Sequence, residues 1–186
     1  YSIVSLDDTE AFYAQVSQGF FVKVKTGATQ VQFTTDMQTH RADAPFKSGT
    51  VQFPELKLTA SMEGTNRMAR IKFNDETTTG LDFGYDAGVF KTGFDIYTKL
   101  VEDNGVDFGV QSLPETGIEQ YEIQVGLDVK SGGEISFSLE QENFVVGVIP
   151  VLTDNQTGTS FVFNNKEDVY TTAVNTETNG YGHFTL

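Results

Sequence analysis

The chain has 186 residues, enough for one sizeable hydrophobic core. Its 26 acidic residues outnumber the 12 basic residues and give a net charge of -14, which disfavours nucleic acid and anionic membrane surfaces as partners. It has no cysteine and two histidines, so the composition excludes disulfides, thiolate catalysis, cysteine-bound metal centres and a histidine-rich metal site.

Hydropathy favours a chain that does not insert into a membrane. No run approaches the 18 or more apolar residues that would span a bilayer, and residues 1–10 lack the basic and apolar regions of a signal peptide. We therefore expect a processed or excised piece of a protein, monomeric as an isolated domain.

Short runs rich in Val, Ile, Phe, Tyr and Thr recur along the chain and alternate in polarity, which is typical of strands. In residues 19–25, for example, Phe20, Val22 and Val24 fall on one face, and Lys23 and Lys25 on the other. The predicted strands are residues 19–25, 29–34, 56–62, 68–73, 121–127, 135–139, 144–152, 160–163 and 183–186.

Turn signals separate these runs. Residues 25–28, 62–65, 130–134 and 154–158 each offer Gly or an Asx side chain, and we interpret them as hairpins. Helical periodicity is nearly absent, so the pattern predicts an all-β fold, an antiparallel β-sandwich of the jelly-roll kind. We expect one domain over residues 1–186, with a surface loop at residues 37–49.

Residues 74–114 depart from the strand rhythm and are unusually acidic. Asp75, Asp82 and Asp86 lie close together in sequence, with Asn74 beside them. Calcium takes six to eight oxygen ligands, and irregular acidic loops supply them. The hypothesis is therefore a calcium site with Asp82 and Asp86 as preferred ligands, and the alternative is that these acids form turns and a solvated surface.

A sugar site needs an aromatic face and a few planar polar groups, and the chain has no Trp. Tyr85 and Tyr97 are the predicted ligand-binding residues, Tyr85 first because it stands beside Asp86 in a loop. The alternative for Tyr85 is a buried ring hydrogen-bonded to the backbone. The chain has no Gly-x-Ser-x-Gly motif that would supply a serine nucleophile for either histidine to activate. His183 is interpreted as a structural residue of its strand.

Several short runs of residues, taken in their order along the chain, resemble the sequence of a known family. They are QGFFVK at residues 18–23, RIKFND at 70–75, GYDAG at 84–88, DIYT at 95–98, QSLP at 111–114, LTDNQTG at 152–158 and HFTL at 183–186. Together they resemble a β-sandwich module of Bacteroidetes cell-surface proteins that lies just upstream of the C-terminal sorting domain read by the type IX secretion system. The sorting domain and a Trp-rich segment before Gln18 are missing here, which leaves two alternatives for residues 1–17, a complete or an incomplete edge of the fold.

The resemblance implies an extracellular or cell-surface location and an accessory role in a larger protein, with no catalytic residues. The expected function is therefore a non-catalytic module for adhesion, carbohydrate attachment or spacing, with a glycan or a surface protein as partner. The alternative is a hydrolase of the glycosidase type that uses paired carboxylates.

Overall fold

The computed structural model describes residues 13, 27, 30–38, 52–82, 84–99, 101, 107–175 and 178–186. By its internal contacts the chain divides into two units, Tyr1–Ile3 with Gln52–Leu186, and Val4–Val51. In the second unit the described residues include a short 3-10 helix, η1 (Thr35–Met37), and residues 30–34, predicted as part of a strand, form none. The predicted strand at residues 19–25 lies outside the described residues, and the single domain over 1–186 stays a prediction.

In the described residues of the first unit the regular secondary structure is strand, apart from one short 3-10 helix, which confirms the all-β prediction. Its elements are β1 (Glu55–Met62), β2 (Thr65–Phe73), β3 (Ala87–Gly88), β4 (Asp95–Lys99), β5 (Asp107–Leu113), η2 (Ile118–Gln120), β6 (Gln124–Asp128), β7 (Gly133–Glu142), β8 (Val151–Asp154), β9 (Thr159–Val162), β10 (Val169–Val174) and β11 (Asn179–Thr185). In the part of the chain that the structure describes, no helix is long and apolar enough to cross a membrane.

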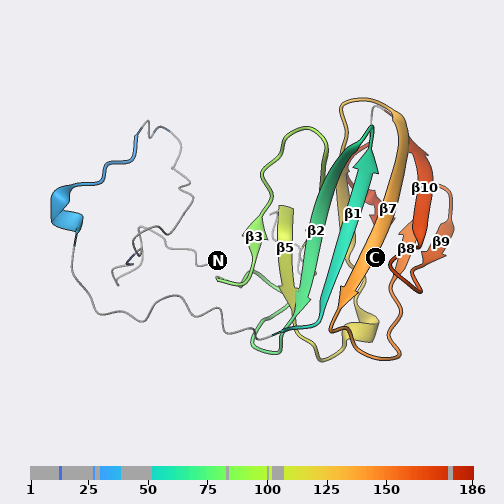
Figure 1. Ribbon diagram of the computed structural model, residues 1–186, viewed down its shortest axis with the longest axis horizontal. Helices are drawn as coiled ribbons and strands as arrows, with labels where there is room; N and C mark the ends of the chain where they lie inside the picture. Colours follow the sequence, from blue (N-terminus) through green and yellow to red (C-terminus); the bar gives the residue numbers. More distant parts are fainter. Residues whose placement is uncertain are drawn as a thin grey trace. The chain divides into compact units, whose positions relative to one another are not determined.

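The prediction of a two-sheet antiparallel sandwich is wrong. The strands form one mixed sheet in the order β10-β7-β1-β2-β5-β4-β6-β11-β8-β9, with β3 paired to β5. Figure 1 shows β3, β5, β2, β1 and β7 side by side in this sheet. Two residue pairs, Thr98↔Phe108 and Lys99↔Asp107, join β4 to β5 and make the hydrogen bonding continuous. The sheet curls so that β10, at one end, meets β8, the next-to-last strand at the other end: the Tyr170 hydroxyl of β10 donates to Asp154 of β8 over 2.9 Å.

One pairing is parallel, between β2 and β5, with Arg70 opposite Val110 and Lys72 opposite Ser112. Parallel neighbours need a long connection, and here residues 74–106 supply it with β3 and β4 in place of a helix. The alternation of polarity in each strand does not reveal this pairing.

The predicted turns have mixed outcomes. The hairpin at residues 62–65 is confirmed, with positive φ at Glu63 (49°) and Gly64 (76°), as a type I′ turn requires. The hairpin at 154–158 is also confirmed, and the Gly158 N–H donates to the Asp154 carbonyl over 2.8 Å. Residues 130–134, however, connect β6 and β7, which are not neighbours in the sheet.

The predicted strand at 144–152 also needs correction. β8 begins only at Val151, and the residues before it form a loop with positive φ at Asn143 (50°) and Gly147 (93°). This loop, residues 143–150, is apolar in sequence but not extended.

The core fills the space enclosed by the curled sheet. In β1 the inward positions alternate along the strand, so that Leu58 and Ala60 are fully buried. Across the interior, the Phe137 ring of β7 lies 4.7 Å from the Phe184 ring of β11. The continuous cluster of buried side chains therefore comes from both halves of one sheet.

Candidate functional site

A cleft of about 420 Å³ lies at one end of the curled sheet. Its wall includes Phe73 at the end of β2, Tyr121 just after η2, and Phe144 in the loop before β8. The Phe73 ring stacks on Tyr121 at 6.4 Å and meets the Phe144 ring edge-on at 5.7 Å. The cleft volume falls in the range of small-ligand sites in proteins.

The floor of the cleft is fixed by the last residue of the chain. Leu186 and Ile123 exchange two backbone hydrogen bonds, of 2.7 and 2.9 Å, so the C-terminus extends the pairing of β11 with β6. Both side chains line the cleft and give it an apolar base. Because the backbone polar groups here are paired with each other, the base offers hydrophobic contact.

Polar groups stand at the rim of the cleft. Glu119 and Glu122 come from η2 and the residues after it, and Asn155 comes from the β8–β9 turn. All three side chains are exposed. The Asn155 amide donates to the Gly182 carbonyl over 3.2 Å and to the Thr185 hydroxyl over 3.1 Å, which orients its carbonyl oxygen as an acceptor.

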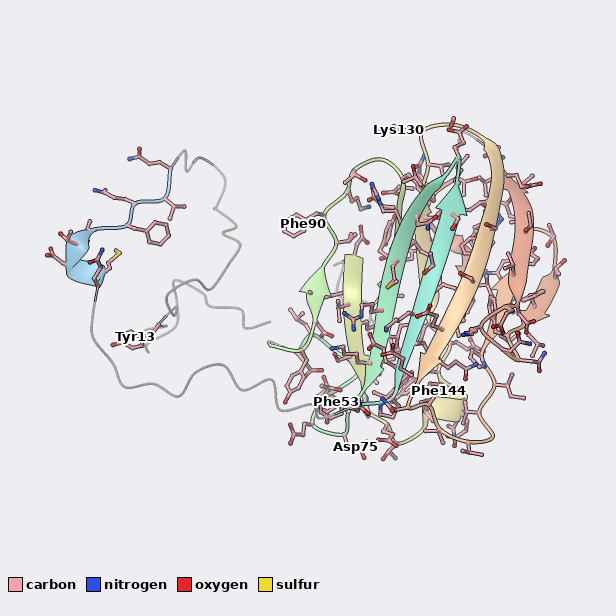
Figure 2. The ribbon with its side chains drawn as sticks, in the orientation of Figure 1. Tyr13, Phe53, Asp75, Phe90, Lys130 and Phe144 are labelled. Atoms are coloured by element: carbon pink, nitrogen blue, oxygen red, sulfur yellow. The ribbon has the colours of Figure 1, made fainter. Side chains whose placement is uncertain are left out.

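The exposed side of the cleft is the apolar loop at residues 143–150. Val146 in this loop is 99% exposed and Ile149 is 55% exposed. Figure 2 shows Phe144 at the same, lower end of the sheet as Phe53 and Asp75, with Lys130 at the opposite end. The cleft therefore opens at one end of the curled sheet rather than on its side.

The acids predicted to bind calcium lie in the loop between β2 and β3, where backbone N–H groups already contact them. The Asp82 carboxylate accepts from the Thr78 N–H over 2.6 Å. Asp86 is fully buried and accepts from the N–H groups of Asp82 (2.7 Å) and Ser112 (2.6 Å). Burial raises the pKa of Asp86, although these two N–H groups act against the increase. Asp86 thus connects the loop to β5 through the hydrogen bond from Ser112.

Asp75, the third predicted calcium ligand, has a backbone contact elsewhere in the chain. Its carboxylate accepts from the Thr116 N–H over 2.9 Å. Among the residues that the structure describes, no three His, Asp or Glu side chains are grouped so that they could hold a metal ion. Calcium binding by Asp75, Asp82 and Asp86 stays a prediction.

The two predicted ligand-binding tyrosines differ in exposure. Tyr85 is 37% exposed, and its hydroxyl donates to Glu76 Oε2 over 2.7 Å, which raises the pKa of Tyr85. Tyr97 is 1% exposed, so its ring offers no open face to a ligand in this arrangement. Ligand binding by these tyrosines stays a prediction, and Tyr85 has the accessible ring.

Tyr97 belongs to a polar network that sequence analysis missed. Its hydroxyl donates to Asp128 over 2.7 Å, and burial followed by this bond raises the pKa of Tyr97 to about 12. Lys91 bridges Asp128 (2.9 Å) and Asp107 (2.7 Å), and Tyr181 donates to Asp107 over 2.5 Å. The network stabilises the short junction between β5, β4, β6 and β11. No local sequence signal joins these residues, because they come from four separated segments.

His183 occupies a buried structural position, as its strand pattern suggested. Its Nε2 lies 3.2 Å from Asp154 Oδ1, and its ring stacks on Phe184 at 4.0 Å. The Nδ1 atom is buried with no hydrogen-bond partner. Burial lowers the pKa of His183, and the neighbouring Asp154 offsets only part of that effect. A neutral imidazole that donates from Nε2 fits these contacts.

Comparisons of the chain with models of protein families, with curated proteins and with solved structures found no match.

The cleft was not found from the sequence because its residues come from five distant segments. One weak signal was present, the run of apolar residues at 144–149, which we interpreted as a strand. In a strand these residues would pair with a neighbouring strand, whereas Phe144, Val148 and Ile149 of this run line the cleft.

Proposed function

We propose that this chain is a non-catalytic, extracellular attachment module of a larger secreted or surface protein, and that it binds carbohydrate in the cleft at the end of the sheet. The observation that carries the proposal is the combination of aromatic walls with a polar rim in one cleft of about 420 Å³. A cleft of this size accommodates one or two sugar rings.

The chemistry of the lining suits a sugar. Pyranose rings present apolar C–H faces and a belt of hydroxyl groups, and the cleft offers matching groups. Tyr121 and Phe144 supply aromatic surface, while the carboxylates of Glu119 and Glu122 accept hydrogen bonds from hydroxyls. Because both charged groups are acidic, the cleft favours an uncharged glycan over an anionic one.

The extracellular location is supported by the sequence motifs that resemble the module of type IX-secreted surface proteins. That resemblance also supports an accessory role in adhesion, with a glycan or a glycosylated surface protein as partner. An attachment module acts next to other domains, so we expect it to bind its glycan as a monomer.

A glycan array followed by calorimetry tests the proposal. We expect binding of a neutral oligosaccharide that Tyr121→Ala abolishes and Tyr121→Phe retains, since the ring provides the contact surface. Glu119→Gln and Glu122→Gln should weaken binding, and Glu115→Gln serves as the control because Glu115 is exposed nearby but does not line the cleft. Absence of any bound glycan, or equal binding by all variants, would overturn the proposal.

A second candidate function is a glycosidase, favoured by the presence of two carboxylates, Glu119 and Glu122, at the same cleft. Generic chromogenic glycosides separate it from the first. Turnover that both Glu119→Gln and Glu122→Gln abolish, with binding retained, would establish the hydrolase in place of the attachment module.

A further inference from the structure

Every charged side chain in the lining of the cleft is acidic. The lining includes Glu119 and Glu122 and contains no Lys, Arg or His. Both side chains are exposed, and in the part of the chain that the structure describes neither carboxylate has a cationic partner. The rim of the cleft therefore carries two negative charges that a ligand could neutralise.

The basic residues of β1 and β2 that adjoin the lining in sequence lie on the other face of the sheet. Leu56 and Phe73 line the cleft. Because alternate side chains of a strand lie on opposite faces, their neighbours Lys57 and Lys72 project from the outer face. Lys57 also forms an ion pair with Glu142. No positive charge from these two strands therefore enters the cleft.

The uncharged polar groups of the cleft add acceptors to these two carboxylates. Both hydrogens of the Asn155 amide are used, in bonds to the Gly182 carbonyl (3.2 Å) and the Thr185 hydroxyl (3.1 Å), so its carbonyl oxygen is what remains for a ligand. The backbone N–H groups of Ile123 and Leu186 donate to each other's carbonyls. An ammonium group, with three donors and a positive charge, complements a rim of this kind.

The negative potential extends to the aromatic wall of the cleft. Figure 2 shows Asp75 at the same end of the sheet as Phe144. Burial raises the pKa of Tyr121, and the negative charge of Asp75 raises it further. A positive group on a ligand that lies against Tyr121 would therefore be stabilised by Asp75 as well as by the acids of the rim.

A bare cation would leave the apolar part of the cleft unused. Ile123 and Leu186 form an apolar base, and Tyr121 and Phe144 supply aromatic walls. Among the described residues, no three His, Asp or Glu side chains are grouped so that they could hold a metal ion. An amino sugar combines the apolar face of a sugar ring with an ammonium group, and so it matches both parts of the lining.

We propose that the cleft prefers a glycan with a free amino group, whose ammonium is bound by Glu119 and Glu122 while its ring lies against Tyr121. This inference rests on the function proposed above and narrows its ligand class. Charge-assisted hydrogen bonds are stronger than neutral ones, so an ammonium should bind more tightly than a hydroxyl at the same position of the sugar. Salt screens exposed charges, and the preference should therefore shrink as ionic strength rises.

Calorimetric titration of the whole chain with matched sugars tests the preference. The glucosamine disaccharide, N,N′-diacetylchitobiose and cellobiose share one backbone and differ in whether they carry an amine, an acetylated amine or a hydroxyl. Galactosamine and galactose form a second pair with another ring configuration. In mildly acidic buffer, where the amines are protonated, we expect the amine form of at least one series to bind at least about tenfold more tightly than its hydroxyl form. Acetylation, which removes the charge, should abolish that gain.

The variants are chosen to preserve the fold, because both acids are exposed. Combining Glu119→Gln with Glu122→Gln removes the two charges at nearly the same shape, and the ratio of amine to hydroxyl affinity should then fall to about one. Glu134→Gln lowers the negative charge of the chain at an exposed position of β7, at the far end of that strand from Phe144. As the matched control, Glu134→Gln should keep the ratio of the parent.

Several results would overturn the inference: equal affinity for amine and hydroxyl forms, or an amine preference that persists in the combined Glu119 and Glu122 variant. A dilysine peptide that competes with the glucosamine disaccharide and binds as tightly would also overturn it, because the sugar ring would then contribute nothing. Cellobiose or galactose that binds without any amine preference overturns this inference alone. Absence of binding by every sugar tested, in contrast, counts against the proposed function as well.

Discussion

The Tyr170 hydroxyl donates a hydrogen bond of 2.9 Å to Asp154 Oδ2 and so connects β10 to β8 across the two ends of the sheet. Asp154 is fully buried and also accepts from the Thr157 N–H (3.1 Å) and the Gln156 N–H (3.0 Å). Burial alone would raise the pKa of Asp154, but these hydrogen bonds hold it below its ordinary value. Thr172 of β10 donates to the same carboxylate oxygen over 3.2 Å, so Asp154 connects β8 to β10 through two hydroxyl groups.

Tyr170→Phe should destabilise the protein, because a buried carboxylate loses one of its donors. The expected loss in free energy of unfolding is about 1–3 kcal/mol, measured by urea denaturation. Tyr121→Phe is the control, since the Tyr121 hydroxyl makes a longer bond of 3.3 Å near the surface, to the Thr116 carbonyl. Equal stability of Tyr170→Phe and the parent would show that the hydrogen bond from Tyr170 to Asp154 does not stabilise the fold.

Stability should fall with acidification because of His183. The pKa of His183 is lower in the folded chain than its ordinary 6.5, so below that pH the unfolded chain takes up a proton that the folded chain does not. The free energy of unfolding therefore decreases as the pH falls below 6.5, and this decrease ends once the pH is below the pKa of His183 in the folded chain. A second loss follows below 3.8, because the pKa of Asp154 is also lowered.

Denaturation of the His183→Gln variant at a series of pH values isolates this effect. Gln retains a neutral donor toward Asp154 and cannot titrate, so the slope just below pH 6.5 should flatten. His40→Gln, which changes the other histidine of the chain, is the matched control and should keep the slope. If the slope flattened in His40→Gln and not in His183→Gln, the pH dependence could not be assigned to His183.

Asp86→Asn should destabilise the protein in both the presence and the absence of EDTA. The carboxylate accepts two N–H groups, whereas an amide offers one oxygen and turns its NH₂ toward a second donor. The expected loss is about 1–3 kcal/mol in thermal or urea unfolding. If EDTA lowered the melting temperature of the parent but not that of Asp86→Asn, the calcium hypothesis for Asp82 and Asp86 would be established.

Gly126→Ala should disrupt the network around Tyr97. A Cβ at this position would lie 2.1 Å from Cε2 of the Tyr97 ring, which is below any real contact distance. The expected cost is about 1–3 kcal/mol, as for overpacked cores, read from the denaturation midpoint. Gly109→Ala is the control, because its Cβ would meet neighbours at an ordinary 3.7 Å. Similar stability of both variants would show that the Tyr97 ring moves aside freely.

The sequence alone determined the local structure of several segments. Alternating polarity predicted β1 and most of β2, and the Glu63–Gly64 turn between them has the positive φ angles that a two-residue hairpin needs. The same reasoning missed β4, β5 and β10. In β4, Ile96, Tyr97 and Thr98 are buried in succession, so the alternation that marks a half-exposed strand is absent.

The cleft escaped prediction because its residues meet only in the folded chain. Tyr85 was singled out from the sequence, but the pairing of β2 with β5 is what brings Lys72 and Ser112 to it. Asp82 and Asp86 were predicted as metal ligands because a sequence shows the spacing of acidic residues. It does not show the backbone N–H groups that donate hydrogen bonds to their carboxylates.

What the sequence by itself determined is the all-β character, several of the strands and the tight turns at residues 62–65 and 154–158, because these depend on interactions between residues a few positions apart. Only the tertiary structure decided that the strands form one continuous sheet, that Tyr97 is buried and Tyr85 exposed, and that Tyr170 meets Asp154. These features depend on contacts between distant segments. Their free energies come from burial and from satisfying buried polar groups, which no local pattern encodes.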